Sequence, residues 1–302
     1  MKKLSVVISA FNGQNKIERA LISARFADEL IVIDNSSEDD SRKIAEKYTK
    51  NIISQKNDPQ KIDLLKNIGI ENAKKDWILI LDQDEQITPE LEKEIVTVIN
   101  SDSKQNGYWI PRKNIIFGKI LEHAGWYPDY QLRLFKNKKG KFSEKHVHQV
   151  LKVDGETGYL KGHLMHENYE TIPQFISKLN VYAQSEADKL LDEGYLFSFA
   201  DAISFPLKEF LSRFFMRQGY KDGFHGLMVS LLMSFYHFVV FANLWEKEKF
   251  KEENSKETFN MAKKGLIQVN KETKYWIRSA EIENNSNSST KFLLRLARKL
   301  SK

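Results

Sequence analysis

Two acidic residues follow one of the most apolar segments of the chain. Asp82 and Asp84 come directly after residues 77–81 and are separated by a single residue. Residues two apart at the end of a strand point to the same side, so both carboxylates can reach one hard cation. Mg²⁺ and Mn²⁺ take oxygen ligands, and Mg²⁺ usually binds through one or two carboxylates together with phosphate oxygens and water. The spacing predicts a divalent-cation site beside a phosphate group.

Polar residues also follow the first two apolar segments. Ser9 and Asn12 end the first segment, and Asp34 ends the second. In an open α/β sheet, ligands bind beyond the carboxyl ends of the strands. Asp34 is an acceptor-only carboxylate, which suits an N–H of a nucleobase or a ribose hydroxyl. Alternatively, Asp34 or Ser36 caps the helix that follows.

The elements that must position these residues alternate between strand and helix over the first hundred residues. Near-continuous apolar strands separated by helices are typical of a parallel sheet covered on both faces. Because each of these strands is apolar on both faces, all are expected at central positions. The strands are expected at 4–9, 29–33, 51–54 and 77–81, and the helices at 15–25, 41–48, 61–74 and from Thr88 onward.

Beyond residue 105 the pattern changes to short, mostly antiparallel strands and then to helices. The strands are expected at 107–112, 131–135, 147–153 and 159–164, and the helices at 172–191, 206–218, 223–245 and about 258–269. A polar linker at 284–289 precedes a basic helix at 291–302. The predicted organisation is an α/β domain over 1–170, a helical extension over 171–283, and the linker with its basic amphipathic helix over 284–302.

Composition excludes several classes of protein. The 302 residues are 41% hydrophobic and 29% charged, which is ordinary globular composition. Cysteine is absent, which excludes disulfide scaffolds, thiolate zinc sites, iron–sulfur clusters and thiol nucleophiles. A net charge of +6 is too small to indicate nucleic acid as a partner. The first apolar run is interrupted too soon for a signal peptide, so we expect a cytoplasmic location.

Several tracts carry a family resemblance. They are residues 5–12 (SVVISAFN), 30–37 (LIVIDNSS), 66–67 (KN), 76–85 (DWILILDQDE), 126–135 (WYPDYQLRLF), 162–169 (GHLMHENY) and 219–223 (GYKDG). Together they resemble the family 2 glycosyltransferases, and within them the bacterial lipopolysaccharide-core β-glucosyltransferase group, over about residues 4–245. The resemblance implies a GT-A fold: a mixed sheet with helices on both faces, followed by a helical extension. It also implies transfer of a hexose from a nucleotide-diphospho-sugar, with UDP-glucose as the guess, to a lipid-linked or cell-envelope glycan.

The same resemblance implies roles for individual residues. Ser9, Asn12 and Asp34 would face the nucleotide, with Lys66 and Asn67 beside it. Asp82 would approach the ribose or the metal, and Asp84 would ligate the Mn²⁺ or Mg²⁺ that bridges the diphosphate. His166 would reach the diphosphate or metal from the far side, although a satisfied core histidine is the alternative.

Inverting transfer needs a base for the acceptor hydroxyl and positive charge for the leaving diphosphate. Asp129 is the candidate base and Glu144 the second candidate. The family is expected to carry a Val-His-Glu tract here, whereas this chain has Gln149, and glutamine cannot act as a base. Arg133 either binds an anionic group or pairs with a carboxylate. Four nearby aromatic residues either stack on sugars or pack in the core: Trp109, Trp126, Tyr127 and Tyr130.

Three segments favour a membrane surface. Residues 226–245 are apolar and long enough to span a bilayer, although a helical region can also bury them. Residues 210–217 mix large apolar and basic side chains, as interfacial helices do. Residues 291–302 carry five positive charges and no acids, with Leu293, Leu296 and Leu300 on one face. We therefore expect a peripheral protein that binds the anionic cytoplasmic face of the membrane, with a solvated or self-packed tail as the alternative.

Two other functions remain open at this point. A nucleotidyltransferase also uses a nucleotide fold and a carboxylate-bound metal, but residues 9–13 lack the usual glycine-rich, basic phosphate loop. A catalytically inactive, membrane-docked sugar- or nucleotide-binding module is favoured by Gln149. The presence of both Asp82 and Asp84 argues against that module.

Overall fold

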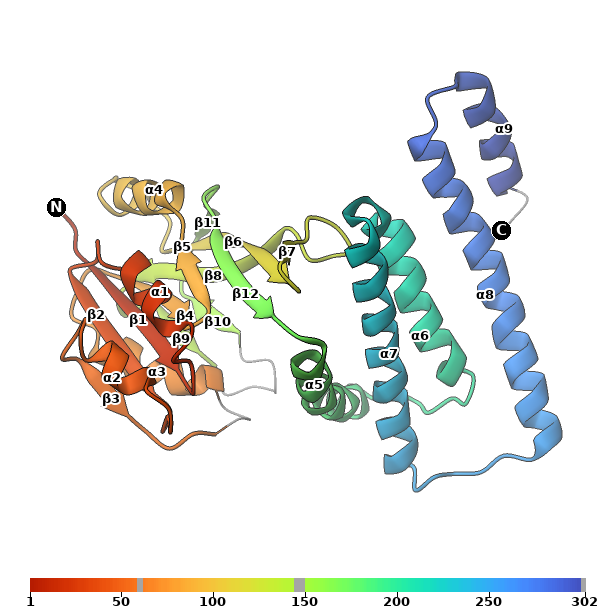
Figure 1. The fold of residues 1–302 in the computed structure, drawn as a ribbon, viewed down its shortest axis with the longest axis horizontal. Helices are drawn as coiled ribbons and strands as arrows, with labels where there is room; N and C mark the ends of the chain where they lie inside the picture. The colour runs from red at the N-terminus through yellow and green to blue at the C-terminus, as the bar shows by residue number, and fades with distance from the viewer. Residues whose placement is uncertain (59–61, 144–149, 300–302) are drawn as a thin grey trace. The chain divides into compact units, whose positions relative to one another are not determined.

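The computed structural model describes residues 1–58, 62–143 and 150–299, which form two compact units (Figure 1). Met1–Ile116 and Pro128–Asn168 form the sheet unit, and Phe117–Tyr127 and Tyr169–Lys302 form the helical unit. The chain passes between the units three times, and the third passage, at residues 168–169, lies close to the expected boundary at residue 170. Phe117–Tyr127, which we expected in the α/β domain, belong instead with the helices.

The first half of the sheet unit is parallel. β1 (Leu4–Ala10) pairs with β2 (Glu29–Asp34) on one side and with β4 (Trp77–Asp82) on the other, and β2 pairs with β3 (Ile52–Ser54). The helices of this half are α1 (Ile17–Ser23), α2 (Ser41–Ala45), α3 (Ile62–Asn72) and α4 (Pro89–Ile99). As the sequence predicts, Thr88 caps α4, with its hydroxyl accepting from the backbone N–H of Leu91.

The second half makes the sheet mixed. β8 (Asp129–Lys136) pairs antiparallel with both β4 and β6 (Gly107–Ile116), and β12 (Leu164–Tyr169) pairs antiparallel with β5 (Glu85–Ile87). The strand order is β3-β2-β1-β4-β8-β6-β12-β5. Two smaller pairings complete the unit: β11 (Thr157–Tyr159) with β6, and β9 (Gly140–Phe142) with β10 (Leu151–Val153).

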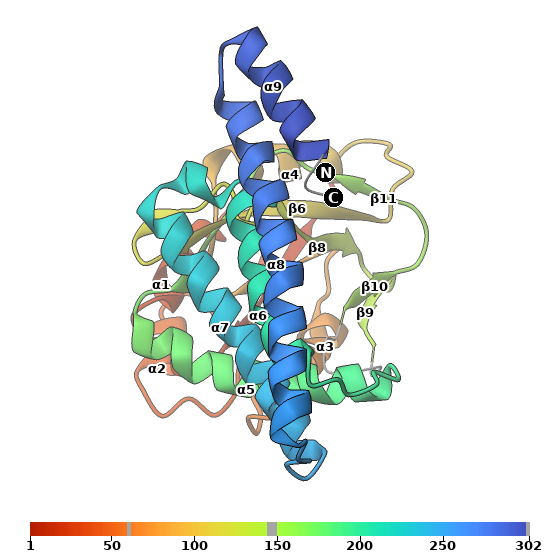
Figure 2. The ribbon, with the colours of Figure 1, turned by 90° about the vertical axis from the view of Figure 1, so that its right-hand side faces the viewer.

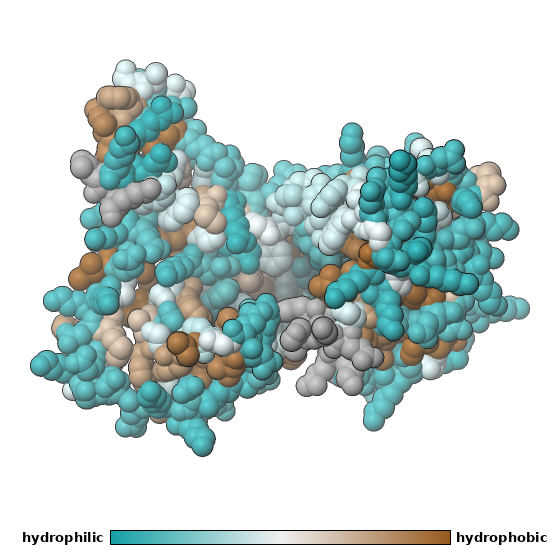
Figure 3. Space-filling model, turned by 180° about the vertical axis from the view of Figure 1, so that it is seen from behind, coloured by the Kyte–Doolittle hydropathy of each residue, from teal (hydrophilic) through white to brown (hydrophobic). Residues whose placement is uncertain are grey.

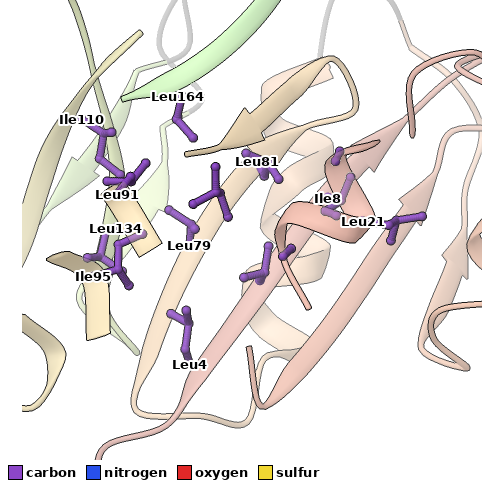
Figure 4. Packing of buried hydrophobic residues seen from close by; sticks show 14 of the residues in the cluster. Leu4, Ile8, Leu21, Leu79, Leu81, Leu91, Ile95, Ile110, Leu134 and Leu164 are labelled. Atoms are coloured by element: carbon purple, nitrogen blue, oxygen red, sulfur yellow. The ribbon is translucent and has the colours of Figure 1, made fainter. Parts of the chain in front are cut away.

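Helices cover both faces of this sheet, as predicted. Alternate residues of β1 and β4 pack on opposite sides because successive side chains of a strand point to opposite faces. Leu4, Ile8 and Leu79 meet α1 and α4 on one face (Figure 4). Val7 and Ile80 pack on the other face, where Ile70 of α3 covers them. Each apolar strand therefore contributes side chains to two hydrophobic clusters, one on each face of the sheet.

Three expectations about elements are wrong. β3 lies at the edge of the sheet rather than at a central position, because it is only three residues long and none of its side chains is fully buried. Residues 160–163 are not a strand but join β11 to β12. β5, directly after Asp84, was not anticipated, because three residues are too short to show a period.

The helical unit contains five α-helices among its described residues. They are α5 (Ile172–Asp192), α6 (Asp201–Leu211), α7 (Phe224–Lys247), α8 (Ser255–Asn284) and α9 (Ser288–Lys299), shown in Figure 2. A π-helical turn at Ser212–Met216 and a 3₁₀ turn at Gly219–Asp222 join α6 to α7, and a short strand, β7 (Lys119–Ile120), precedes them in the chain. α8 is longer than the expected 258–269. Ala183 and Ala187 of α5 pack against Val240 and Leu244 of α7.

The tract at residues 219–223 bonds to the loop Phe117–Tyr127. The buried Asp222 carboxylate accepts hydrogen bonds from the backbone N–H groups of Glu122 (3.3 Å) and His123 (2.9 Å). The Lys119 ammonium donates to the Asp222 carbonyl at 2.7 Å. These bonds explain why Phe117–Tyr127 group with the helices.

Gly226 and Gly265 give a matched test of this packing. A Cβ at Gly226 of α7 would lie 1.8 Å from the Gly219 carbonyl oxygen, whereas one at Gly265 of α8 would lie 3.4 Å or more from its neighbours. Gly226→Ala should therefore lower the free energy of unfolding by about 1–3 kcal/mol because the backbone must shift. Gly265→Ala should be neutral or stabilising by up to about 1 kcal/mol, since alanine favours helix over glycine. Thermal unfolding followed by circular dichroism measures both, and equal effects would contradict the packing.

Candidate active site

Three loops meet at the carboxyl ends of β1, β2 and β4. Gln83, after β4, bonds twice to the loop after β1: its Oε1 accepts from the Phe11 N–H and its Nε2 donates to the Phe11 carbonyl, both at 2.9 Å. Asn12 joins the loop after β2, where its Oδ1 accepts from the Glu38 N–H at 2.9 Å. A Cβ at Gly13 would lie 2.1 Å from the Gln83 Oε1, so glycine makes the close approach possible. The loops that follow β1, β2 and β4 are thus hydrogen-bonded to one another.

Two residues in these loops have left-handed backbone conformations. Asn12 has φ 47° and Ser36 has φ 61°. Such conformations cost free energy for residues with a Cβ and persist where surrounding bonds hold them. The Asn12 N–H donates to the Ser37 hydroxyl at 3.1 Å, and the Ser36 hydroxyl donates to the Gln55 carbonyl at 2.8 Å. The loops are therefore held in shape by hydrogen bonds between them.

Asp34 and Ser9 lie inside this assembly. Asp34 is buried, and its Oδ1 accepts from the Ser37 N–H at 3.1 Å. The next helix, α2, has Asp40 at its N-terminal cap, so neither Asp34 nor Ser36 caps it and that alternative is wrong. The Ser9 hydroxyl is also buried and accepts from the Asn35 amide at 3.1 Å. Contact of Ser9, Asn12 or Asp34 with a nucleotide stays a prediction.

A chain of ion pairs runs from α3 across the sheet. The Asp82 carboxylate lies 2.6 Å from the Lys66 ammonium through one oxygen and 2.6 Å from the Arg133 guanidinium through the other. Arg133 also reaches Glu85 at 3.2 Å, and Arg112 reaches the same Glu85 oxygen at 3.0 Å. Four elements, α3, β4, β6 and β8, together with the start of β5, therefore converge on these groups. Arg133 is a carboxylate partner, one of the two expected roles.

The ion pairs set the charges of the buried groups. Burial alone would raise the pKa of the Asp82 carboxyl, but Arg133 and Lys66 outweigh burial and hold that pKa far below its usual range. Burial would also raise the pKa of Glu85, but Arg133 and Arg112 outweigh burial and lower that pKa. Both carboxyls are therefore ionised at neutral pH. Among the described residues, the Arg133 Nε is a buried donor without a hydrogen-bond acceptor.

Asp129 ends this chain of charges. Its Oδ2 accepts from the Arg112 Nε at 2.9 Å and from the Asn114 amide at 3.1 Å, and its Oδ1 accepts from the Gln131 amide at 2.7 Å. Burial alone would raise the pKa of Asp129. Arg112 and the amide donors lower it by more than burial raises it, so the net pKa lies below the usual value. Asp129 is a positioned, ionised carboxylate.

Asp84 and Asp82 have different partners. Residues 83 and 84 form a turn after β4, so the alternation of a continuing strand does not apply to them. Asp84 lies beside His166, with its Oδ1 3.7 Å from the Nε2, whereas Asp82 lies against Lys66 and Arg133. The imidazole Nδ1 contacts the Asn114 Oδ1 at 2.7 Å. Burial lowers the pKa of His166, although Asp84 opposes this, so the ring is neutral at pH 7.

A divalent cation fits the pair formed by Asp84 and His166. A carboxylate oxygen and a neutral imidazole nitrogen are both ligands that Mn²⁺ accepts, and the Asp84 side chain is 20% exposed. Within residues 1–58, 62–143 and 150–299, no group of three histidine or acidic side chains forms a metal site by itself. Such a cation would need phosphate or water oxygens to complete its shell.

The remaining predicted residues are placed as follows. The Asn67 amide bonds to the Phe142 backbone in both directions, at 2.9 and 3.0 Å, and so anchors β9. Glu144 and Gln149 lie outside the described residues. The four aromatic residues do not form one cluster: Trp109 and Tyr130 flank Tyr159 of β11, whereas Trp126 packs against Tyr169 in the helical unit, to which Tyr127 also belongs.

Sequence reasoning missed Gln83, Glu85, Arg112 and Asn114. Glu85 was visible as the last residue of the acidic tract at 82–85, but nothing local shows that it is buried. Arg112 and Asn114 lie two apart on one face of β6 and reach Asp129 17 and 15 positions away. Only the pairing of β6 with β8 brings them together.

Comparisons with known proteins find similar sequences among glycosyltransferases. Residues 5–151 match the model of glycosyl transferase family 2. An uncharacterized glycosyltransferase of Rickettsia typhi is 28% identical over 263 residues, 82% of this chain and 88% of that protein. The lipopolysaccharide core biosynthesis glycosyltransferase LpsC of Rhizobium meliloti is 21% identical over 253 residues, 82% of this chain and 94% of LpsC.

Solved structures show weaker likeness. Residues 1–349 of S. aureus TarS in complex with UDP-GlcNAc align with a TM-score of 0.40 and 14% identity, over 83% of this chain and 93% of that one. Glucosyl-3-phosphoglycerate synthase from Mycobacterium tuberculosis, in complex with phosphoglyceric acid, aligns with a TM-score of 0.42 and 15% identity, over 65% of this chain and 82% of that one.

Removing the central guanidinium should destabilise the sheet unit. Arg133→Met leaves Asp82 and Glu85 each without one cation, and breaking a buried pair costs about 3–5 kcal/mol of unfolding free energy. The folded pKa values of both carboxyls are lowered, so the ion pairs contribute their full stabilisation above about pH 5, where the carboxyls are ionised even in the unfolded chain. That stabilisation is lost as the pH falls from the unfolded pKa values toward the lower folded ones. Urea unfolding at pH 7 and pH 3.5 should show a smaller acid-induced loss in the variant. The double variant with Glu85→Gln is the control, and an unchanged single variant would refute the network.

Proposed function

We propose that this chain, whose residues 5–151 match glycosyl transferase family 2, is an inverting glycosyltransferase that transfers a hexose from a nucleotide-diphospho-sugar to a lipid-linked or cell-envelope glycan. UDP-glucose is the first donor to test. The observation that carries the proposal is the arrangement of carboxylates in this region. Asp84 lies beside His166, and Asn114 connects His166 to Asp129, while Asp82 after the same strand pairs with Lys66 and Arg133. The family match favours this reaction over nucleotidyl transfer.

The donor would lie across the ends of β1, β2 and β4. Asn12 and Asp34 would offer an amide and a carboxylate to the nucleoside. Ser9 bonds to Asn35 in the loop after β2, and Asn67 bonds to Phe142 of β9. Asp84 and His166 would hold Mn²⁺ or Mg²⁺, which when bound would add positive charge beside the leaving diphosphate. Asp82 would contribute to the cation or the ribose only by giving up part of its contact with Lys66 or Arg133. The unpartnered Nε of Arg133 supports an anionic ligand at this place.

The acceptor side would use Asp129. Its carboxylate takes the proton of the acceptor hydroxyl as that oxygen bonds to the anomeric carbon, and the bond from this carbon to the diphosphate breaks on the opposite face. Arg112, Asn114 and Gln131 hold the carboxylate in place. Glu144 stays the second candidate base.

The acceptor class and location rest on two observations. LpsC, a relative of this chain, is named for lipopolysaccharide core biosynthesis. The basic helix α9 exposes Phe292, Leu293 and Leu296, as a helix bound at an anionic membrane surface would. We include peripheral attachment at the cytoplasmic face of the membrane in the proposal.

The metal pair makes one prediction. Asp84→Asn keeps the shape of the side chain but removes the charge that would hold the cation, so kcat should fall at least 100-fold with an unchanged melting temperature. EDTA should abolish activity and Mn²⁺ restore it. Nucleotide release from a panel of nucleotide sugars measures both effects. Asp154→Asn, at an exposed carboxylate, is the control. Wild-type turnover in Asp84→Asn would exclude this role.

The base makes a second prediction. Asp129→Asn should lower kcat at least 100-fold with little change in the KM for the donor, because the base acts in the transition state. Since the pKa of Asp129 is lowered, the acidic limb of kcat/KM should lie below about pH 4. An inactive Glu144→Gln beside an active Asp129→Asn would move the assignment to Glu144.

A further inference from the structure

Helix α7 of the helical unit is apolar on two opposite faces. Its inner face, with Val229, Val240 and Leu244, is buried against α5 and α6. Its outer face repeats large apolar residues every seven positions, and these side chains are exposed by 73, 45, 46 and 37%: Phe224, Leu231, Phe238 and Trp245. Phe235, exposed by 47%, lies between them, as does the partly buried Met228. At 100° per residue these six residues cover about 100° of the helix.

The segment that forms this outer face contains no charged residue. From Phe224 to Trp245 the sequence has no aspartate, glutamate, lysine or arginine. The residues that border the outer face include Leu227, Leu232 and Val239. A protein interface has a polar rim, and a coiled-coil seam usually has charged flanks that fix its partner. An apolar border without such groups suits lipid, which does not require a register.

Cations lie at the N-terminal end of the outer face. Arg217 and Lys221 are exposed directly before α7, Lys221 also lies 3.4 Å from the Glu283 carboxylate, and Met216 beside them is exposed by 46%. Basic side chains next to exposed apolar ones complement an anionic lipid surface. At the other end, Trp245 packs edge-on against the exposed Phe250, and tryptophan favours the membrane–water interface.

α7 is the one helix in the described part of the chain that is long and apolar enough to cross a membrane. Its inner face, however, is occupied by α5 and α6, and α5 carries charged residues such as Lys178, Glu186 and Asp188. Crossing the bilayer would pull those charges into hydrocarbon or strip α7 from its partners. Only the outer face is available, so the helix can bury it while lying parallel to the surface.

We propose that α7 lies in the plane of an anionic membrane and inserts its outer face into the lipid. This inference deepens the membrane attachment included in the proposed function and assigns it to particular residues. The two units are joined by the chain at residues 116–117, 127–128 and 168–169, so binding by the helical unit keeps the sheet unit near a lipid-linked acceptor.

The test is flotation of the full-length protein with vesicles of phosphatidylcholine containing 30% phosphatidylglycerol. The triple variant Leu231→Gln, Phe235→Gln and Phe238→Gln should bind at least tenfold more weakly. The matched control replaces three exposed apolar residues of α8, Phe259, Leu266 and Ile267, by glutamine and should bind as wild type. Pure phosphatidylcholine or 0.5 M salt should weaken wild-type binding, and carbonate at high pH should release it.

Several outcomes would overturn the inference. Equal loss in both triple variants, or loss only on deleting residues 290–302, would remove α7 from the binding surface. Retention after carbonate extraction would indicate a spanning helix. A dimer in lipid-free sedimentation that the α7 variant dissociates, without vesicle binding by the wild type, would assign the face to a second copy. The single variant Phe235→Gln, with an intermediate loss, guards against misfolding of the triple variant. Nucleotide release from the donor sugar is measured separately, so failure of the catalytic proposal leaves the flotation result intact.

Discussion

Glu85 is a carboxylate with no exposed surface, and the active-site region is organised around its charge. A buried charge is unfavourable unless ion pairs and hydrogen bonds compensate it. Here Arg112 and Arg133 share one oxygen, and the other accepts from the Asp82 N–H at 2.9 Å. β4, β6 and β8 must therefore come together at this point, and the antiparallel half of the sheet is tied to the parallel half.

The two arginines that pair with Glu85 also bind other carboxylates. The network of ion pairs therefore continues from Arg133 on one side and from Arg112 on the other. Arg133 continues to Asp82 and Lys66, on the side of the loops after β1 and β2. Arg112 continues to Asp129, and Asn114 links Asp129 to His166 and so to Asp84. The cationic partners lower the pKa values of Asp82, Glu85 and Asp129, whereas burial lowers the pKa of the His166 imidazole and leaves it neutral. The same ion pairs and hydrogen bonds thus hold in place Asp129, which we propose as the base, and His166, which we propose as a metal ligand with Asp84.

In the helical unit, α7 has more apolar surface than α5 and α6 cover. α5 and α6 bury one face of α7. Figure 3, seen from behind, shows apolar side chains among polar ones at the surface of the helical unit. The buried Asp222 meanwhile ties the loop Phe117–Tyr127 to the turn before α7. A segment that interrupts the strands of the sheet unit is thereby part of the unit that we propose binds lipid.

The sequence by itself determined the parallel strands β1, β2 and β4, the helices between them, the cap of α4 and the polar residues that follow the strand ends. These features depend on apolar runs and neighbouring residues, which are local. The tertiary structure alone decided that β3 lies at the edge, that Asp84 faces His166 while Asp82 faces Lys66 and Arg133, and that Phe117–Tyr127 join the helices. The partners of Asp82, for example, include a residue 51 positions away. Such pairs depend on strand order and register, which no local period of hydrophobic residues records.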